Sequence, residues 1–259
     1  MKPSNKIFGL PFPLAGFFVL VLAYVWIFGS ATYFVWTEKN HAAKNPRLAI
    51  IPIPLSDTSI SSAPGKTVSY FGYQFEAPSE VKELRVANSI AFVGSGSGQW
   101  VVGFFNPATS RGFVSTDRDE LGPLFGGMAR IYGEDNVKSD YDFVRATLNA
   151  SPSQLSLIFP RIREVRAATF MMLKETEILG GETGLYSFEI GHLRGFQLGD
   201  PARTKNVHIK AFDAENHEFE FLFGGKPGPT LGLAQADINR VLETLRPAVP
   251  TQQENPRKK

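Results

Sequence analysis

The chain has 259 residues, with 27 basic and 25 acidic side chains and no cysteine. Its formal net charge is only +2, and its basic residues are scattered among acidic ones, so we expect no nucleic-acid partner. Without cysteine the chain cannot form a disulfide, a thiolate zinc site, an iron–sulfur cluster or a cysteine nucleophile.

An apolar run without any charge extends from Leu14 to Trp36. Its length of roughly 23 residues suits a helix that crosses a hydrocarbon core, and exceeds the apolar core of a cleaved signal peptide. We therefore predict a short N-terminal tail over 1–13 and a single transmembrane helix over 14–36, in contact with membrane lipid. Basic residues nearly balance on its two sides. The short tail and the large following domain favour a cell-membrane protein with a cytoplasmic N-terminus and a periplasmic or otherwise extracytoplasmic C-terminal domain.

Small residues recur at seven-residue intervals in and just before this run: Gly9, Gly16, Ala23 and Ser30. Small residues let membrane helices approach closely, so this stripe is a candidate for packing against other integral membrane subunits. The alternative is that small residues are simply common in membrane helices. Tyr33 and Trp36 lie near the end of the run, where aromatic residues typically mark the membrane interface.

The rest of the chain divides into three parts by composition. Residues 37–67 are rich in Pro and Ser and are expected to form an extended linker. Residues 68–246 carry the patterns of regular structure and are expected to form one globular domain. Residues 247–259 are polar and have no means of building a core, so we expect a disordered tail.

Within that domain the expected elements change from strands to helices and back. Alternating apolar residues predict three strands that form an antiparallel meander, the last two joined by a turn at 95–98: 68–78, 88–94 and 99–105. Helical patterns follow at 141–150, 152–159 and 160–179. Four further strands and a closing helix are then expected: 184–191, 194–199, 205–213, 217–225 and 236–246. This order predicts an α+β domain, an antiparallel sheet covered by helices.

The helix expected over 160–179 is amphipathic. Its apolar face is expected to turn toward the core: Ile162, Val165, Thr169, Met172 and Leu173. Its charged residues are expected mostly on the opposite face, in solvent: Arg161, Arg163, Arg166, Lys174 and Glu175. The arginines could alternatively form a patch for anionic lipid.

The pattern of several segments resembles a known superfamily. The opening segment GYQFEAP with its following hairpin, the pair KNVHIKAFD and HEFEFLF, and the closing helix ADINRVLETLR are similar to the α/β/α sandwich of the PsbP-like superfamily. The resemblance covers about Val68 to Arg246 and has no diagnostic motif, and the helices around Tyr141 to Leu179 depart from the family's usual short connection. The resemblance implies an accessory module that docks onto a larger assembly.

No motif in the sequence points to catalysis or to a cofactor. The four histidines are too dispersed for a metal motif, although His208 and His217 lie on strands expected to be neighbours and could face each other. The glycine-rich segment from Gly94 to Gly98 lacks the spacing of a nucleophile elbow or a dinucleotide loop, and leads into a strand. Acidic residues between Asp117 and Asp135 lack the spacing of a calcium loop. We therefore assign no catalytic, cofactor-binding or metal-binding residue, and expect no cofactor.

Three functional hypotheses remain. The first is a non-enzymatic, single-pass accessory or scaffold subunit of a larger membrane protein complex, such as a photosynthetic or respiratory assembly. The second is a membrane-tethered hydrolase, for which an open pocket with converging acid and base groups would be the sign. The third is a module that binds a small apolar or lipid ligand, for which a large cavity would be the sign.

Overall fold

The computed structural model describes residues 6–7, 10–78, 81–109, 137–157, 160–177, 184–225 and 230–248; up to residue 28, of the side chains only Val25 is described. The chain folds as two compact units. Unit 1 comprises Met1–Ile51, Gly126–Asn136 and Ala146–Glu177. Unit 2 comprises Pro52–Phe125, Val137–Arg145 and Ile178–Lys259.

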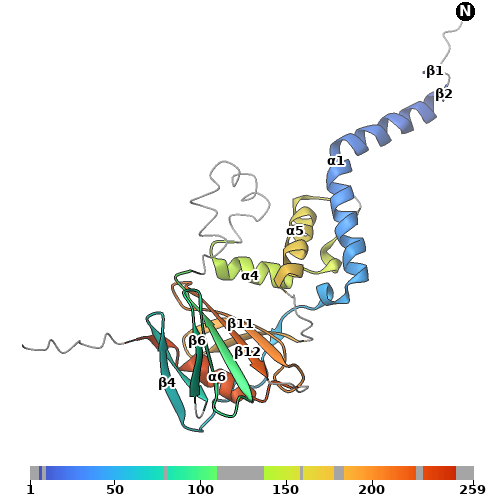
Figure 1. The fold of residues 1–259 in the computed structure, drawn as a ribbon. Helices are drawn as coiled ribbons and strands as arrows, with labels where there is room; N and C mark the ends of the chain where they lie inside the picture. Colours follow the sequence, from blue (N-terminus) through green and yellow to red (C-terminus); the bar gives the residue numbers. More distant parts are fainter. Residues whose placement is uncertain are drawn as a thin grey trace, which may run out of the picture. The chain divides into compact units, whose positions relative to one another are not determined.

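Unit 2 is built on an eight-stranded sheet with the strand order β3-β9-β10-β11-β12-β8-β7-β6 (Figure 1). Its strands are β3 (Ile53–Pro54), β6 (Val81–Val86), β7 (Ile90–Ser95), β8 (Trp100–Phe105), β9 (Leu185–Ile190), β10 (Leu193–Leu198), β11 (Asn206–Phe212) and β12 (Glu218–Gly225). All neighbours are antiparallel except β3 and β9. The α+β class expected from the sequence is confirmed.

A second sheet of unit 2 contains β4 (Gly65–Tyr70), β5 (Tyr73–Pro78) and β13 (Arg246–Pro247). The single strand expected over 68–78 is instead the hairpin of β4 and β5. The chain reverses at Phe71 and Gly72, which have φ angles of 53° and 81°. Two successive positive φ angles are what a tight hairpin turn requires, and glycine adopts one of them without strain. In the expected meander, β6 takes the place of this strand.

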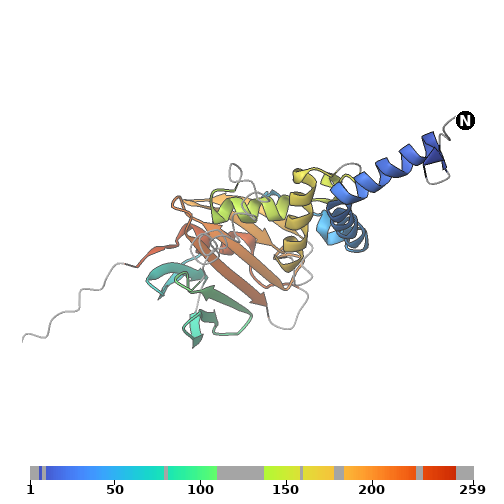
Figure 2. The ribbon, with the colours of Figure 1, turned by 90° about the horizontal axis from the view of Figure 1, so that it is seen from above.

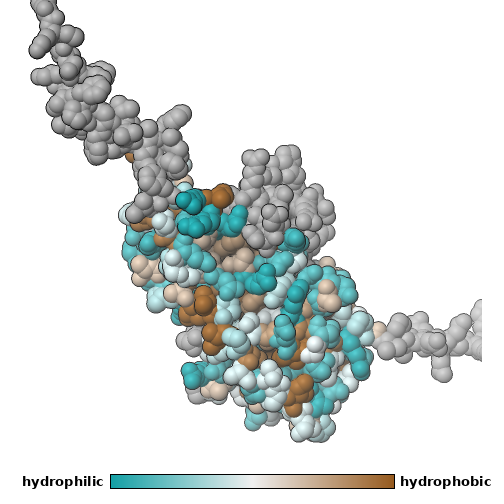
Figure 3. Space-filling view, turned by 180° about the vertical axis from the view of Figure 1, so that it is seen from behind, coloured by the Kyte–Doolittle hydropathy of each residue, from teal (hydrophilic) through white to brown (hydrophobic). Residues whose placement is uncertain are grey.

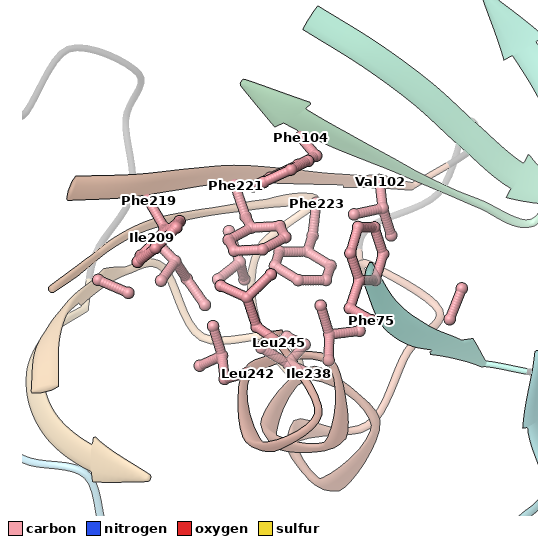
Figure 4. Packing of buried hydrophobic residues seen from close by; sticks show 14 of the residues in the cluster. Phe75, Val102, Phe104, Ile209, Phe219, Phe221, Phe223, Ile238, Leu242 and Leu245 are labelled. Atoms are coloured by element: carbon pink, nitrogen blue, oxygen red, sulfur yellow. The ribbon is translucent and has the colours of Figure 1, made fainter. Parts of the chain in front are cut away.

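The core of unit 2 lies between the large sheet and helix α6 (Gln235–Glu243). Alternate residues of β12 turn toward the helix, and Figure 4 shows Phe219, Phe221 and Phe223 above Ile238 and Leu242. These side chains are at most 2% exposed. Burial at every second residue is the pattern of a strand with one covered face.

Helix α6 also fixes the segment that leads into β4. Asn239, which is fully buried, donates hydrogen bonds to the carbonyl oxygens of Asp57 at 2.9 Å and Ser59 at 2.8 Å. Arg240 donates to the carbonyl oxygen of Ser61 at 2.8 Å and to the carboxylate of Glu76. Two neighbouring side chains of one helix therefore hold this irregular segment through its backbone carbonyl oxygens.

Unit 1 is mainly helical in its described part. It contains α1 (Phe12–Lys44), preceded by the two-residue strands β1 (Lys6–Ile7) and β2 (Leu10–Pro11), and the 3₁₀ turns η1 (Pro46–Ala49) and η2 (Pro152–Gln154). It also contains α5 (Ile162–Glu177) and the last residues of α4 (Asp140–Asn149), whose first residues belong to unit 2. The C-terminal half of α1 lies beside α5 (Figures 1 and 2), where His41 Nε2 is 3.0 Å from both carboxylate oxygens of Glu175.

The prediction of a transmembrane helix over 14–36 is wrong. In the part of the chain that the structure describes, no helix combines the length and the apolar character that crossing a bilayer requires. Helix α1 does not end at Trp36 but continues to Lys44, and its last turns are charged. Lys39 donates to the carbonyl oxygen of Leu155 at 3.0 Å, and His41 contacts Glu175, so these turns pack within unit 1. The charge-free run is thus one part of a longer helix that continues through charged residues.

The buried face of α5 also differs from the expected one. Ile162 and Met172 are 55% and 47% exposed, whereas Lys174 is fully buried. Thr169 is buried as expected, and the other buried positions of the helix are Glu164, Ala167, Ala168, Phe170, Met171 and Lys174. The expectation failed because this face includes small residues and two charged residues, Glu164 and Lys174, that are buried with hydrogen-bonding partners, which a hydrophobic pattern does not detect. The helix expected over 152–159 is only the turn η2, and residues 158–159 lie outside the described residues.

Replacing Asn239 by Ala tests whether its hydrogen bonds attach residues 57–59 to α6. We expect the free energy of unfolding to fall by about 1–3 kcal/mol, because two carbonyl oxygens and the Gln235 amide lose a buried partner. Urea unfolding followed by circular dichroism measures this. Asn206→Ala, at an exposed position of β11, is the matched control and should change stability by less than about 0.5 kcal/mol. Equal effects of the two substitutions would contradict this role of Asn239.

Candidate functional site

A cavity of about 610 Å³ lies in unit 1. It is lined by the end of α4, the turn η2 and its continuation, and the first half of α5: Ala146, Asn149, Ala150, Ser153, Gln154, Leu155, Ser156, Arg163, Glu164, Arg166, Ala167 and Phe170. Its size falls within the range of about 300–1,000 Å³ that is typical of small-molecule sites. Unit 2 has smaller cavities of about 340 and 240 Å³.

The face shown in Figure 3 has no large apolar patch among the described residues. On the face shown in Figure 3, hydrophilic side chains cover most of the described surface and apolar ones are dispersed among them. Exposed apolar residues scattered in this way are normal for a globular protein.

One wall of the cavity is set by the turn that follows α4. Ser151 and Gln154 form a reciprocal cap: the Ser151 hydroxyl accepts from the Ser153 amide, and the Gln154 side chain accepts from the Ser151 amide at 3.1 Å. Pro152 occupies the first position of the turn, where its fixed φ angle is favourable. These local preferences place Leu155, which is 3% exposed, at the cavity.

The opposite wall is the first part of α5, which carries a buried carboxylate. Glu164 is 2% exposed, and its oxygens accept from the backbone amide of Arg161 at 2.8 Å and from Nε of Arg163 at 2.6 Å. Burial raises the pKa of Glu164, but these hydrogen bonds outweigh burial and hold its pKa below the ordinary value of 4.5. Glu164 is therefore a carboxylate at neutral pH that caps the helix and orients Arg163.

A buried ammonium group ties the cavity to the rest of unit 1. Lys174 Nζ donates to the carbonyl oxygens of Ile50 at 2.5 Å, Ala150 at 2.8 Å and Leu48 at 3.3 Å. Three acceptors match the three donors of an ammonium group. Burial lowers the pKa of Lys174 from 10.5 to about 8, so the group remains mostly protonated at neutral pH. Ala150 is also a lining residue, so Lys174 fixes part of the cavity wall.

The arrangement is suited to binding. Apolar side chains supply most of the contact area that an organic molecule needs, and polar side chains stand among them at Asn149, Gln154, Arg163 and Arg166. Glu164 is the carboxylate among the lining residues, and it already accepts two hydrogen bonds.

The residues singled out from the sequence lie elsewhere. Gly9 lies outside the described residues, the surroundings of Gly16 and Ala23 on α1 are likewise not described, and Ser30 is exposed on α1. Tyr33 and Trp36 are 68% and 49% exposed, with ring centroids 6.1 Å apart. Ser30, Tyr33 and Trp36 are not among the described lining residues of the cavity, and the roles of all these positions in helix packing and at a membrane interface stay predictions.

Two histidines pair with carboxylates and not with each other. His208 Nε2 is 2.6 Å from Glu220, and His217 Nδ1 is 2.8 Å from Asp213. Asp213, Glu215 and His217 have possible ligand atoms within 4.8 Å of one another, but Glu215 and His217 are exposed in a hairpin turn, where acidic groups commonly cluster without a metal. The acidic residues from Asp117 to Asp135 lie outside the described residues.

Sequence reasoning missed the cavity, Glu164 and Lys174. The spacing of Glu164 three residues after Arg161 is that of a helix-capping glutamate and was a usable signal. Lys174 gave no signal, since a lysine among charged neighbours normally indicates a solvated face.

The pH dependence of stability tests the burial of Lys174. The folded group releases its proton near pH 8 and the unfolded group near 10.5, so the unfolded state binds more protons in this window and stability rises with pH. We expect the wild type to gain up to about 3 kcal/mol relative to Lys174→Met between these limits. Urea unfolding from pH 7.5 to 10.5 measures the difference. Lys44→Met, at an exposed position of α1, controls for the loss of one charge. A difference that does not change with pH would refute the claim.

Comparison with known proteins gives no match: no family model, curated protein or solved structure is detectably similar to this chain. The resemblance to the PsbP-like superfamily therefore stays a prediction.

Proposed function

We propose that this protein is a non-enzymatic binding protein that takes a small organic molecule into the cavity of unit 1. The observation that carries the proposal is the cavity of about 610 Å³, in which apolar side chains and a few polar groups converge. The accessory-subunit role expected from the sequence stays a separate prediction. Measuring the native mass of the extracted protein tests it, because a subunit would migrate with a larger complex.

The construction of the walls supports a preformed site. Caps at η2 and at the start of α5, together with the ammonium of Lys174, fix the three segments that line the cavity. A site that is ordered before binding loses less conformational entropy when a ligand enters, and so binds it more tightly.

The chemistry of the lining favours binding over catalysis. A general base needs a pKa near the working pH and an open lone pair within reach of a substrate. The pKa of Glu164 is lowered from an already acidic value, and its oxygens are occupied by Arg163 and the Arg161 amide. No histidine is found among the described lining residues.

Filling the cavity tests the proposal. Ala146 lines the cavity and is only partly buried, so Ala146→Trp places a large side chain in the cavity without displacing the core. The probe is the uncharged fluorophore phenylnaphthylamine, titrated into the full chain. We expect wild type to bind about one probe per chain, and Ala146→Trp to weaken binding at least tenfold, or about 1.4 kcal/mol.

Ala43→Trp is the matched control, because it adds the same side chain at an exposed position of α1. It should bind the probe as wild type does. Failure of the wild type to bind, or equal binding by wild type and Ala146→Trp, would refute the proposed function.

A further inference from the structure

We propose that ligand binding in the unit 1 cavity strengthens the attachment of the C-terminal half of α1 to the rest of unit 1. This inference rests on the proposed function, since it describes how occupancy of the same cavity regulates an element outside its lining. It is carried by the hydrogen bonds that join α1, and the segment after it, to two of the cavity walls.

The first connection is made by Lys39, which lies near the end of α1. Its ammonium group donates to the carbonyl oxygen of Leu155 at 3.0 Å. Leu155 is a lining residue at the end of η2, and its side chain is buried. The position of α1 therefore fixes one wall of the cavity, although the described lining contains no residue of α1.

The second connection is made by Lys174 on α5. Its Nζ donates to the carbonyl oxygen of Ala150, a lining residue, at 2.8 Å. The same group donates to the carbonyl oxygens of Leu48 and Ile50 at 3.3 and 2.5 Å, and both residues follow α1. One ammonium group thus joins the segment after α1 to a second wall. A movement of α1 away from α5 would break or displace both connections.

The attachment of α1 to α5 is shallow, so a small free energy is enough to change it. Among the described side chains of α1 the buried ones are Val35 and Ala42, which lie two turns apart on one face. His41 and Glu175 join the two helices (Figures 1 and 2), but they are 46% and 42% exposed, and exposed pairs of this kind stabilise little. Elements with few buried apolar contacts open more readily than the core of a protein.

The direction of the effect follows from linkage. While α1 is attached, Lys39 and Lys174 hold Leu155 and Ala150 in place, so the walls are ordered before a ligand enters. When α1 is released, the Leu155 carbonyl loses its donor and that wall is less ordered. The ligand therefore binds the attached state more tightly, and by thermodynamic reciprocity it strengthens the attachment by the same factor.

Hydrogen–deuterium exchange of the full chain, followed by mass spectrometry, provides the first test. We expect saturating phenylnaphthylamine to slow the exchange of the backbone amides of residues 36–45 about tenfold, a typical coupling between two sites. Exchange in β11 and β12 of unit 2 is the internal control and should not change. This measurement compares the wild type with and without the probe, so it does not depend on the folding of a variant.

Substitution of Lys39 tests whether its hydrogen bond transmits the effect. Lys39→Met keeps an unbranched side chain and removes the donor. We expect it to weaken binding of the probe about tenfold and, at equal occupancy of the cavity, to remove most of the slowing in α1. Lys39→Arg can still donate to Leu155 and should restore both properties. Lys44→Met makes the same chemical change at an exposed position of α1 and should behave as the wild type does.

The outcomes separate this inference from the proposed function. Binding of the probe that leaves exchange in α1 unchanged would overturn the inference and keep the binding function. Equal slowing in α1 and in β11 and β12 would indicate general stabilisation and would also overturn it, as would equal effects of Lys39→Met and Lys44→Met. Absence of probe binding by the wild type would overturn the inference and the proposed function together.

Discussion

Unit 1 depends on one buried ammonium group. Lys174 Nζ gathers carbonyl oxygens at Leu48 and Ile50, which follow α1, and at Ala150, which follows α4. Segments about 100 residues apart in sequence are thereby joined to α5. Burying a carbonyl oxygen without a hydrogen-bonding partner destabilises the fold, and so does burying an unpaired charge. Here the ammonium group donates to the carbonyl oxygens, so neither is left without a partner. The remaining energetic penalty shows as the lowered pKa of the lysine.

The cavity follows from this arrangement. Because Lys174 fixes Ala150, and the cap at Ser151 and Gln154 fixes the next turn, the chain after α4 is held away from the first half of α5. The facing side chains at Ala146, Ala150 and Ala167 are small, so the space between the walls stays open. The same contacts that stabilise unit 1 therefore leave a lined, preformed site with cations around it.

Sequence patterns predicted unit 2 better than unit 1. The strands β11 and β12 alternate fully buried and partly buried residues over much of their lengths, and helix α6 has one apolar side, so local periodicity identified them. The hairpin at Phe71 and Gly72 was missed because a phenylalanine with a positive φ angle interrupts no apolar pattern. In unit 1 the decisive partners of Lys174 are backbone atoms distant in sequence, which no local pattern reveals. The apolar run over 14–36 was interpreted by composition alone, whereas the helix extends into charged residues that pack on α5.

The ammonium of Lys174 can be observed directly by nitrogen-15 magnetic resonance of the lysine side chains. The account predicts one ammonium resonance that exchanges slowly with water, disappears in Lys174→Met, and titrates with a midpoint of about 8. The opposite result is that Lys174→Met removes only a signal that exchanges rapidly with water and titrates near pH 10.5. That result would contradict a buried Lys174 ammonium.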